Sequence, residues 1–500
     1  MKSAPCTGTF VAALYFATLW NVVSSYSSGN GSFPYNFLFG AATASYQVEG
    51  GWNLSGKGEN IWDVFTHTHP EWIADHSSGD IACDSYHNYK KDVKLLKKLQ
   101  VQVYRFSISW ARILPNGDLS LINHSGITYY KNLIAALREV HIEPMVTMYH
   151  WDLPQALEDK GGWLNTQMAD YFKNYASLLF TLFGDQVKWW ITFNEPTEVC
   201  TGYVSRDAAP GVVLPGVGDY KAAHTILQAH AKAYHVYDQK FRSKQKGRVS
   251  ITLSSRWLEP ISESSEDIEA SERGMQFELG WFAHPIYSKS GDYPPLMRKI
   301  VDEHSRAEGL KYSRLPSFSG YWIKYIRGTA DFFALNHYTT RLVTSGEEGE
   351  IPSKEHDTGV ISKVDPSWPS SASKWLKVVP WGFRKLLKWV KSEYRNPPVF
   401  VTENGFSDHG ELEDNDRIYY HKNYLAELLK AINEDGCKVI GYTVWSIMDN
   451  FEWERGYTEK FGVFHVNFSD PARSRQQKKS VEVLSKIFHL KKLDEADNFV

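Results

Sequence analysis

The feature that most constrains this chain is an alternation of short apolar runs with longer amphipathic stretches. The runs have the length of buried strands and the stretches have helical periodicity, which is the pattern of βα units with parallel strands. Eight runs occur among the 500 residues. The expected strands are Phe37–Gln47, Val103–Ile113, Glu143–Asp152, Lys188–Glu195, Arg248–Leu258, Asp331–Tyr338, Pro398–Glu403 and Lys438–Ser446.

The stretches between these runs predict helices with one apolar face. In Asp84–Leu99, for example, Tyr86, Tyr89, Val93 and Leu96 recur at helical spacing. Eight strands, each followed by a helix, close into a (β/α)8 TIM barrel whose active site lies at the carboxyl ends of the strands. A doubly wound open sheet is the alternative, but the chain has no GxGxxG turn. Further helices are expected at Ser125–Glu139, Gln167–Phe183, Asp219–Arg242, Trp381–Tyr394 and Ile418–Glu434.

The first 25 residues have the features of a secretory signal peptide. Lys2 precedes an apolar run from Phe10 to Trp20, which is shorter than the roughly 20 residues of a membrane anchor. No linker rich in Pro, Gly or Ser divides the rest. We therefore expect residues 1–25 to be a signal peptide, residues 26–500 to form one α/β barrel domain with elaborated βα loops, and the protein to be secreted. Four sequons support an extracellular glycoprotein: Asn30, Asn53, Asn123 and Asn467.

Composition narrows the class of partner. Lys and Arg number 55 against 58 Asp and Glu, so the net charge of -3 creates no field for nucleic acid or an anionic membrane. A neutral or small molecule is expected instead. Outside the predicted signal, the cysteines are Cys83, Cys200 and Cys437. An odd number without a CxxC pair argues against a metal or redox site and allows at most one disulfide, so buried or free thiols are favoured. The oligomeric state is left open.

Two carboxylates stand where apolar strands are expected to end. One strand ends at Asn194 and Glu195, and another ends at Thr402 and Glu403. Glycoside cleavage requires such a pair, because one carboxyl group protonates the leaving oxygen while the other meets the anomeric carbon. A single Glu near a strand end is usually a surface carboxylate or a helix cap. Two of them in apolar strand contexts favour the catalytic interpretation.

Several strings, in order along nearly the whole chain, resemble glycoside hydrolase family 1. They are FGAATASYQVEG from Phe39, YRFSISWAR from Tyr104, HWDLP from His150, TFNEP from Thr192, VTENG from Val401, and DNFEW from Asp449. The resemblance implies a retaining β-glycosidase that hydrolyses terminal β-D-glucosides through a covalent glycosyl-enzyme. It implies no cofactor and no metal.

The resemblance also implies residue roles. Glu195 would be the general acid and base, and Glu403 the nucleophile. Arg105 and Tyr338 would keep Glu403 ionised, and Asn194 would hold the sugar 2-hydroxyl. Glu195 must instead stay protonated near neutral pH, through burial and the nearby negative charge. The other substrate-binding residues implied are Gln47, His150 and Glu452 at sugar hydroxyls, Trp445 and Trp453 beside the sugar, and Trp375 as an aglycone platform.

The leaving group is less constrained. Glu452 suits an unmodified glycone, most simply glucose, and would repel a 6-phosphate. The strings are most similar to insect β-glucosidases, but some insect relatives are myrosinases, thioglucosidases whose glucosinolate substrates carry a sulfate. Arg341 or Arg206 could bind that anion, although a loop Arg is more often solvated. Two further alternatives are a transglycosidase with the same catalytic pair and a non-catalytic glycan-binding member, which usually lacks one of the two Glu.

Overall fold

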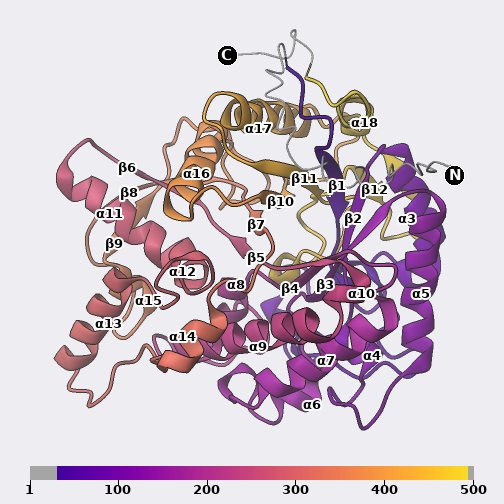
Figure 1. Ribbon diagram of the computed structural model, residues 1–500. Coiled ribbons are helices and arrows are strands. Elements are labelled where there is room, and N and C mark those ends of the chain that lie inside the picture. Colours follow the sequence, from indigo (N-terminus) through magenta and orange to yellow (C-terminus); the bar gives the residue numbers. More distant parts are fainter. Residues whose placement is uncertain (1–30, 494–500) are drawn as a thin grey trace, which may run out of the picture.

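The computed structural model describes residues 31–493, and Figure 1 shows parallel strands enclosed by helices. Eight strands close into a barrel in the order β1-β11-β10-β7-β5-β4-β3-β2, and each neighbouring pair is parallel. The predicted (β/α)8 fold is confirmed. The barrel strands are β1 (Leu38–Ala42), β2 (Val103–Ser107), β3 (Glu143–Tyr149), β4 (Trp189–Asn194), β5 (Arg248–Ser254), β7 (Phe333–Asn336), β10 (Val399–Asn404) and β11 (Val439–Trp445).

The outer helices begin and end with ordinary capping signals. The Asn123 side chain accepts from the backbone N–H of Ser125 at the start of α5, and Pro380 occupies the first turn of α16. Each helix buries its apolar face against the barrel. The helices that follow the strands in turn are α3 (Ser85–Lys98), α5 (His124–Glu139), α7 (Met168–Phe183), α9 (Gly218–Lys240), α12 (Trp281–Tyr287), α16 (Pro380–Glu393), α17 (Asn415–Asn433) and α18 (Ser480–Leu490).

Shorter elements elaborate the loops between strands and helices. The strands β6, β8 and β9 form a small sheet beside the barrel, and β12 pairs with β13. These elements are α1 (Ser45–Val48), α2 (Ile61–Thr68), α4 (Trp110–Ile113), α6 (Gln155–Glu158), α8 (Pro196–Thr201), α10 (Arg242–Gln245), α11 (Ser265–Met275), α13 (Pro295–Ala307), α14 (Gly320–Ile326), α15 (Lys354–Thr358), β6 (Trp257–Pro260), β8 (Thr340–Ser345), β9 (Val360–Lys363), β12 (Phe464–Val466) and β13 (Arg475–Gln477).

Some predicted strands are too long. The run Phe37–Gln47 ends as a strand at Ala42 and continues into α1, and the run Val103–Ile113 ends at Ser107 and continues into α4. The chain turns at the mouth of the barrel, but its residues there stay buried against the loops. Because the residues beyond each strand are also buried, the apolar pattern of the sequence does not show where the strand ends.

Apolar side chains fill the barrel below the mouth. Met145, Ile191 and Phe400 meet Val103 and Ala334 in one buried cluster, each fully or almost fully excluded from solvent. This is the packed interior expected of a TIM barrel, so the carboxyl ends of the strands are left to carry the chemistry.

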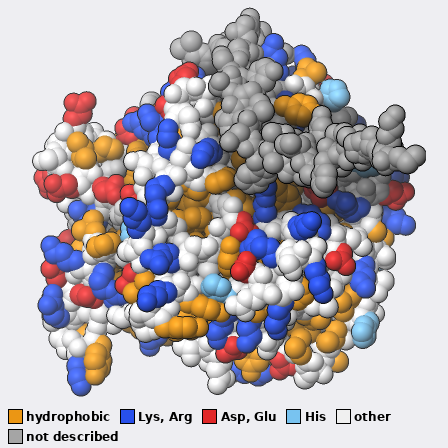
Figure 2. All heavy atoms as spheres, viewed as in Figure 1, with side chains coloured by type: hydrophobic (Ala, Val, Ile, Leu, Met, Phe, Trp, Pro, Cys, Tyr) orange, Lys and Arg blue, Asp and Glu red, His pale blue; other side chains and the backbone are white. Residues whose placement is uncertain are grey.

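The surface has no single-sign field on the face seen in Figure 2, where acidic and basic side chains are scattered among neutral ones. This agrees with the small net charge. Among residues 31–493, no helix combines the length and the apolarity that crossing a bilayer requires. The predicted signal peptide, residues 1–25, lies outside the described residues.

Candidate active site

A cavity of about 490 Å³ opens at the carboxyl ends of the barrel strands. Three residues implied by the sequence, Gln47, Arg105 and Asn194, do not line it but hydrogen-bond to residues that do. The implied residues that line it are His150, Glu195, Tyr338, Arg341, Trp375, Glu403, Trp445, Glu452 and Trp453.

Glu403 lies near the end of β10 with a donor on each oxygen. Nη1 of Arg105 donates to its Oε1 at 2.5 Å, and the hydroxyl of Tyr338 donates to its Oε2 at 2.7 Å. Arg105 comes from β2 and is fully buried, with its Nε donating to Thr147 on β3. A guanidinium and a hydroxyl that both donate to one carboxyl group favour its ionised form. Both oxygens of Glu403 are thus held by donors where the side chain lines the cavity.

Glu195 has the opposite environment. It precedes α8 with a φ of 44°, a strained conformation that is typical of functional sites. Its Oε1 accepts a hydrogen bond from Nδ2 of Asn336 at 2.7 Å. Burial raises the pKa of Glu195 well above its usual value, and the negative charges of Glu403 and Glu198 raise it further. The two carboxyl groups therefore differ in environment: Glu403 accepts from two donors, whereas burial and nearby negative charge favour the protonated form of Glu195.

Asn194 connects the two carboxyl groups. Its Oδ1 accepts from Nη2 of Arg105 at 2.5 Å and from Nδ2 of Asn336 at 3.2 Å. Arg105 also binds Glu403, and Asn336 also binds Glu195. Asn336 received no role from the sequence, although it ends β7 just before Tyr338 and so carried a positional signal.

The predicted sugar-hydroxyl ligands gather at one end of the cavity. Nε2 of Gln47 donates to the Phe451 carbonyl at 2.8 Å and lies 3.4 Å from Oε2 of Glu452. Nε2 of His150 accepts from Nδ2 of Asn194 at 3.0 Å, and burial beside a cation holds the pKa of His150 well below its usual value. The imidazole is then neutral and protonated at Nδ1, a donor without a hydrogen-bond partner among the described residues.

Glu452 stands among other carboxylates. Burial raises its pKa well above the usual value, and the charges of Glu454, Glu459 and Glu403 add to the shift. The sequence did not assign Glu454 or Glu459, which line the same cavity. This end of the cavity offers acceptors to hydroxyl groups and disfavours a second anion.

Aromatic rings form the walls. The Trp453 ring stacks near His150 with 6.0 Å between centroids, and Trp445 lies on the same imidazole at 5.8 Å. Trp375 is 43% exposed and meets Tyr338 edge-on at 5.6 Å. Trp445 and Trp453 are therefore buried walls, whereas Trp375 is the ring at the opening.

The family model for glycosyl hydrolase family 1 matches residues 29–493. This chain belongs to glycosyl hydrolase family 1. It is 54% identical over 450 residues to Myrosinase 1 of Brevicoryne brassicae, covering 90% of this chain and 96% of that protein. A solved aphid myrosinase has 52% identity and a TM-score of 0.90, with 92% and 100% of the two chains covered. A rice β-glucosidase mutant, solved in a covalent complex with Glc, has 40% identity and a TM-score of 0.86, with 91% and 99% covered.

Membership of the family makes this protein a glycoside hydrolase, and retaining hydrolysis of a β-glucoside fits its two carboxyl groups. Within the described residues, no group of three or more His, Cys, Asp or Glu is placed to hold a metal ion.

The two arginines considered for a sulfate are placed differently. Arg341 on β8 lines the cavity and donates to the carbonyls of Trp375 at 2.6 Å and Thr340 at 3.1 Å. Burial and the charge of Arg256 lower the pKa of Arg341 to about 10. Arg206 is exposed, packs over the Trp72 ring at 5.6 Å and does not line the cavity. The cavity instead contains Arg256 and Lys354, which the sequence did not single out.

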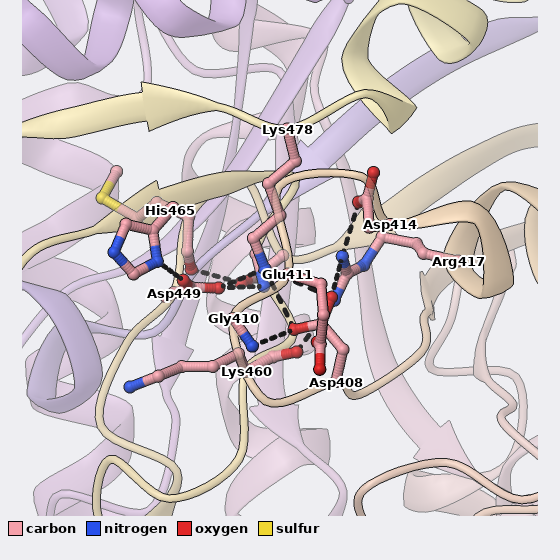
Figure 3. Close-up of polar contacts among 12 residues, drawn as sticks. Asp408, Gly410, Glu411, Asp414, Arg417, Asp449, Lys460, His465 and Lys478 are labelled. Carbon is pink, nitrogen blue, oxygen red and sulfur yellow. Dashed lines mark hydrogen bonds and ion pairs between the residues drawn. The ribbon is translucent and has the colours of Figure 1, made fainter.

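A buried ion network joins the loop that follows β10 and Glu403 to the loop after β11 that carries Glu452, and Figure 3 shows its contacts. Nζ of Lys478 is 3.1 Å from Oδ1 of Asp408, in the loop after β10, and 3.1 Å from Oδ1 of Asp449, in the loop after β11. Lys478 and Asp449 have no exposed side-chain surface. One ammonium group thus joins the two loops.

The remaining sequence expectations concern sequons and thiols. Asn30 lies outside the described residues, whereas Asn53 and Asn467 are exposed. Nδ2 of Asn123 donates to the carbonyls of Ser55 and Arg112, so a glycan on that nitrogen would compete with these two hydrogen bonds. The three cysteines of the described chain are free and buried, namely Cys83, Cys200 and Cys437.

Proposed function

We propose that this protein is a β-glucosidase in which Glu403 is the nucleophile and Glu195 the acid and base. One observation carries the proposal. The two carboxyl groups share a cavity but differ in environment, since Glu403 accepts from a guanidinium and a hydroxyl while burial raises the pKa of Glu195. When two carboxyl groups of one site have such different environments, one acts as the nucleophile and the other as the acid.

The reaction follows from these roles. The Glu403 carboxylate attacks the anomeric carbon as the bond from that carbon to the leaving oxygen breaks, and Glu195 gives its proton to the oxygen. Glu195, now ionised, takes a proton from water, whose oxygen attacks the same carbon and releases Glu403. Two displacements restore the β-configuration and both carboxyl groups.

The glycone end favours an unphosphorylated sugar. Glu452 and its acidic neighbours would repel a phosphate, and Gln47, His150 and Glu452 offer neutral or acceptor groups to hydroxyls. Trp445 and Trp453 supply apolar faces for the ring. Glucose is the simplest sugar that meets these conditions.

A myrosinase is the second candidate, and the 54% identity to Brevicoryne brassicae Myrosinase 1 favours it. Of the two arginines considered for the sulfate, only Arg341 lines the cavity, and its guanidinium already donates to two backbone carbonyls. Neither of the two arginines chosen from the sequence is therefore a free cation inside the cavity, and Arg256 and Lys354 are its other basic residues.

The deciding experiment compares initial rates of the chain without residues 1–25 on aryl β-glucoside, β-galactoside and β-fucoside, cellobiose and sinigrin. We expect turnover of the aryl glucoside to exceed that of sinigrin. Dominant turnover of sinigrin would make the protein a myrosinase. Folded protein that hydrolyses none of them would contradict the proposal and favour a glycan-binding role.

We also propose that the enzyme is exported, supported by the apolar run in residues 1–25 and by exposed sequons at Asn53 and Asn467. Expression in insect cells with analysis of the medium tests this. Retention of the whole product inside the cells would overturn it.

A further inference from the structure

The helix that follows Glu195 points to the leaving-group side of the cavity. In the proposed function Glu195 contacts the glycosidic oxygen, so residues farther along α8 lie beyond that oxygen, away from the glycone ligands Gln47 and Glu452. Glu198 is one turn beyond Glu195 on α8 and lines the cavity with an exposed side chain. It is therefore a carboxylate on the aglycone side, and the catalytic mechanism does not use it.

Glu198 lacks the partners that its neighbours have. Within residues 31–493, no hydrogen bond or ion pair joins its carboxyl group to another side chain or to the backbone. Arg256, across the cavity, binds Glu278 through two contacts of 2.8 Å. Arg341 donates to backbone carbonyls, and Lys354 packs over the Trp281 ring at 5.5 Å. Within residues 31–493, Glu198 and Glu355 are the carboxyl groups on this side of the cavity with unused acceptor capacity, and of the two Glu198 is the one next to the proposed acid Glu195.

We propose that Glu198 selects the leaving group, accepting hydrogen bonds from a hydroxylated or cationic aglycone and disfavouring an anionic one. The inference rests on the proposed function and specifies its substrate class. A bound aglycone displaces water from the cavity, so a carboxylate on the cavity wall attracts ammonium and hydroxyl donors, and repels a carboxylate or sulfate, more strongly than one on an open surface.

The surroundings of Glu198 define its response to pH. Partial desolvation by the cavity walls raises the pKa of Glu198, while the charges of Lys354 and Arg256 oppose that shift and the charge of Glu278 reinforces it. The charges of Glu195, just before α8, and of Glu454, near Glu452, interact with Glu198 as well. As pH rises through its pKa, Glu198 gains charge, and the preference for a cationic aglycone should grow.

The test uses two aryl β-glucosides whose rings carry either an aminomethyl or a carboxylate substituent. We expect wild type to favour the aminomethyl compound in kcat/KM, and Glu198→Gln to shrink that preference by about tenfold, which corresponds to about 1.4 kcal/mol. Comparing ratios between enzymes cancels the intrinsic reactivities of the two compounds. Glu303→Gln, which removes the same charge from an exposed site on α13 outside the cavity lining, should keep the wild-type ratio.

A second readout does not depend on the variant's stability. In wild type the ratio should rise with pH, and in Glu198→Gln it should be flat. The basic limb of the kcat/KM profile should also move to lower pH in the variant, because Glu198 no longer raises the pKa of Glu195. Equal ratios in both enzymes, with turnover of both glucosides, would overturn this inference alone. Absence of turnover on any β-glucoside by wild type would overturn the proposed function and the inference with it.

Discussion

At the scale of single residues, the site contains two glutamate carboxyl groups whose surroundings differ. Glu403 receives donors on both oxygens, whereas Glu195 receives one neutral donor from Asn336 and is otherwise buried. Both are glutamates at strand ends, so their side chains alone cannot distinguish their roles. The positions of Arg105 and Asn336 do so.

This difference predicts how Glu195→Ala behaves. Loss of the acid should reduce kcat/KM on alkyl glucosides by about 10²–10⁴, because their leaving oxygen needs a proton. Nitrophenyl glucosides should lose far less in their first step, since nitrophenolate departs without protonation. Values of kcat/KM on both classes, which report the first step and not release of the glycosyl-enzyme, provide the measurement. Equal losses would argue that Glu195 is not the acid.

At the scale of elements, a buried ion network joins the loop after β10 to the loop after β11, next to Glu403 and Glu452. Asp449 lies three residues before Glu452, and Lys478 ties it to Asp408 in the loop that follows Glu403. Burial alone would raise the pKa of Asp449, but a hydrogen bond from His465 and the charge of Lys478 hold it below its usual value. The network is therefore ionised and internally compensated.

Removing the Lys478 cation from this network should destabilise the folded protein. We expect Lys478→Met to lower the free energy of unfolding by about 3–5 kcal/mol, because buried carboxylates lose their counter-charge. Lys479→Met is the matched control, since its ion pair with Glu413 is exposed and is worth about 0–1 kcal/mol. Denaturant unfolding of the two variants compares them. Equal destabilisation would show that the network does not act as a buried unit.

The same scale shows what the sequence could and could not predict. The eight barrel strands and the positions of Glu195 and Glu403 were predictable, because apolar runs and the residues at their ends are local patterns. The link from Lys478 to Asp408 was not, since it joins residues 70 apart. The sequence also could not predict that Arg341 lines the cavity and Arg206 does not. Both are basic loop residues in the sequence, and only the fold distinguishes them.

At the scale of the whole molecule, the closed barrel explains why the chemistry gathers in one place. Apolar side chains such as Met145, Ile191 and Phe400 fill its interior, and the parallel strands bring their carboxyl ends to one mouth. Residues far apart along the chain, such as Arg105 and Glu403, are thereby placed in contact. Packing alone does not determine the aglycone, which in our proposal depends on the charge of Glu198 at the mouth.

The most direct test of the central claim is to capture the covalent intermediate. A fluorinated glucoside that forms the glycosyl-enzyme faster than water releases it should leave one sugar on the protein. Mass spectrometry of the intact protein and of its peptides would locate that sugar. We predict a single label on Glu403; a label on another residue, or turnover with inverted configuration and no label, would contradict the account.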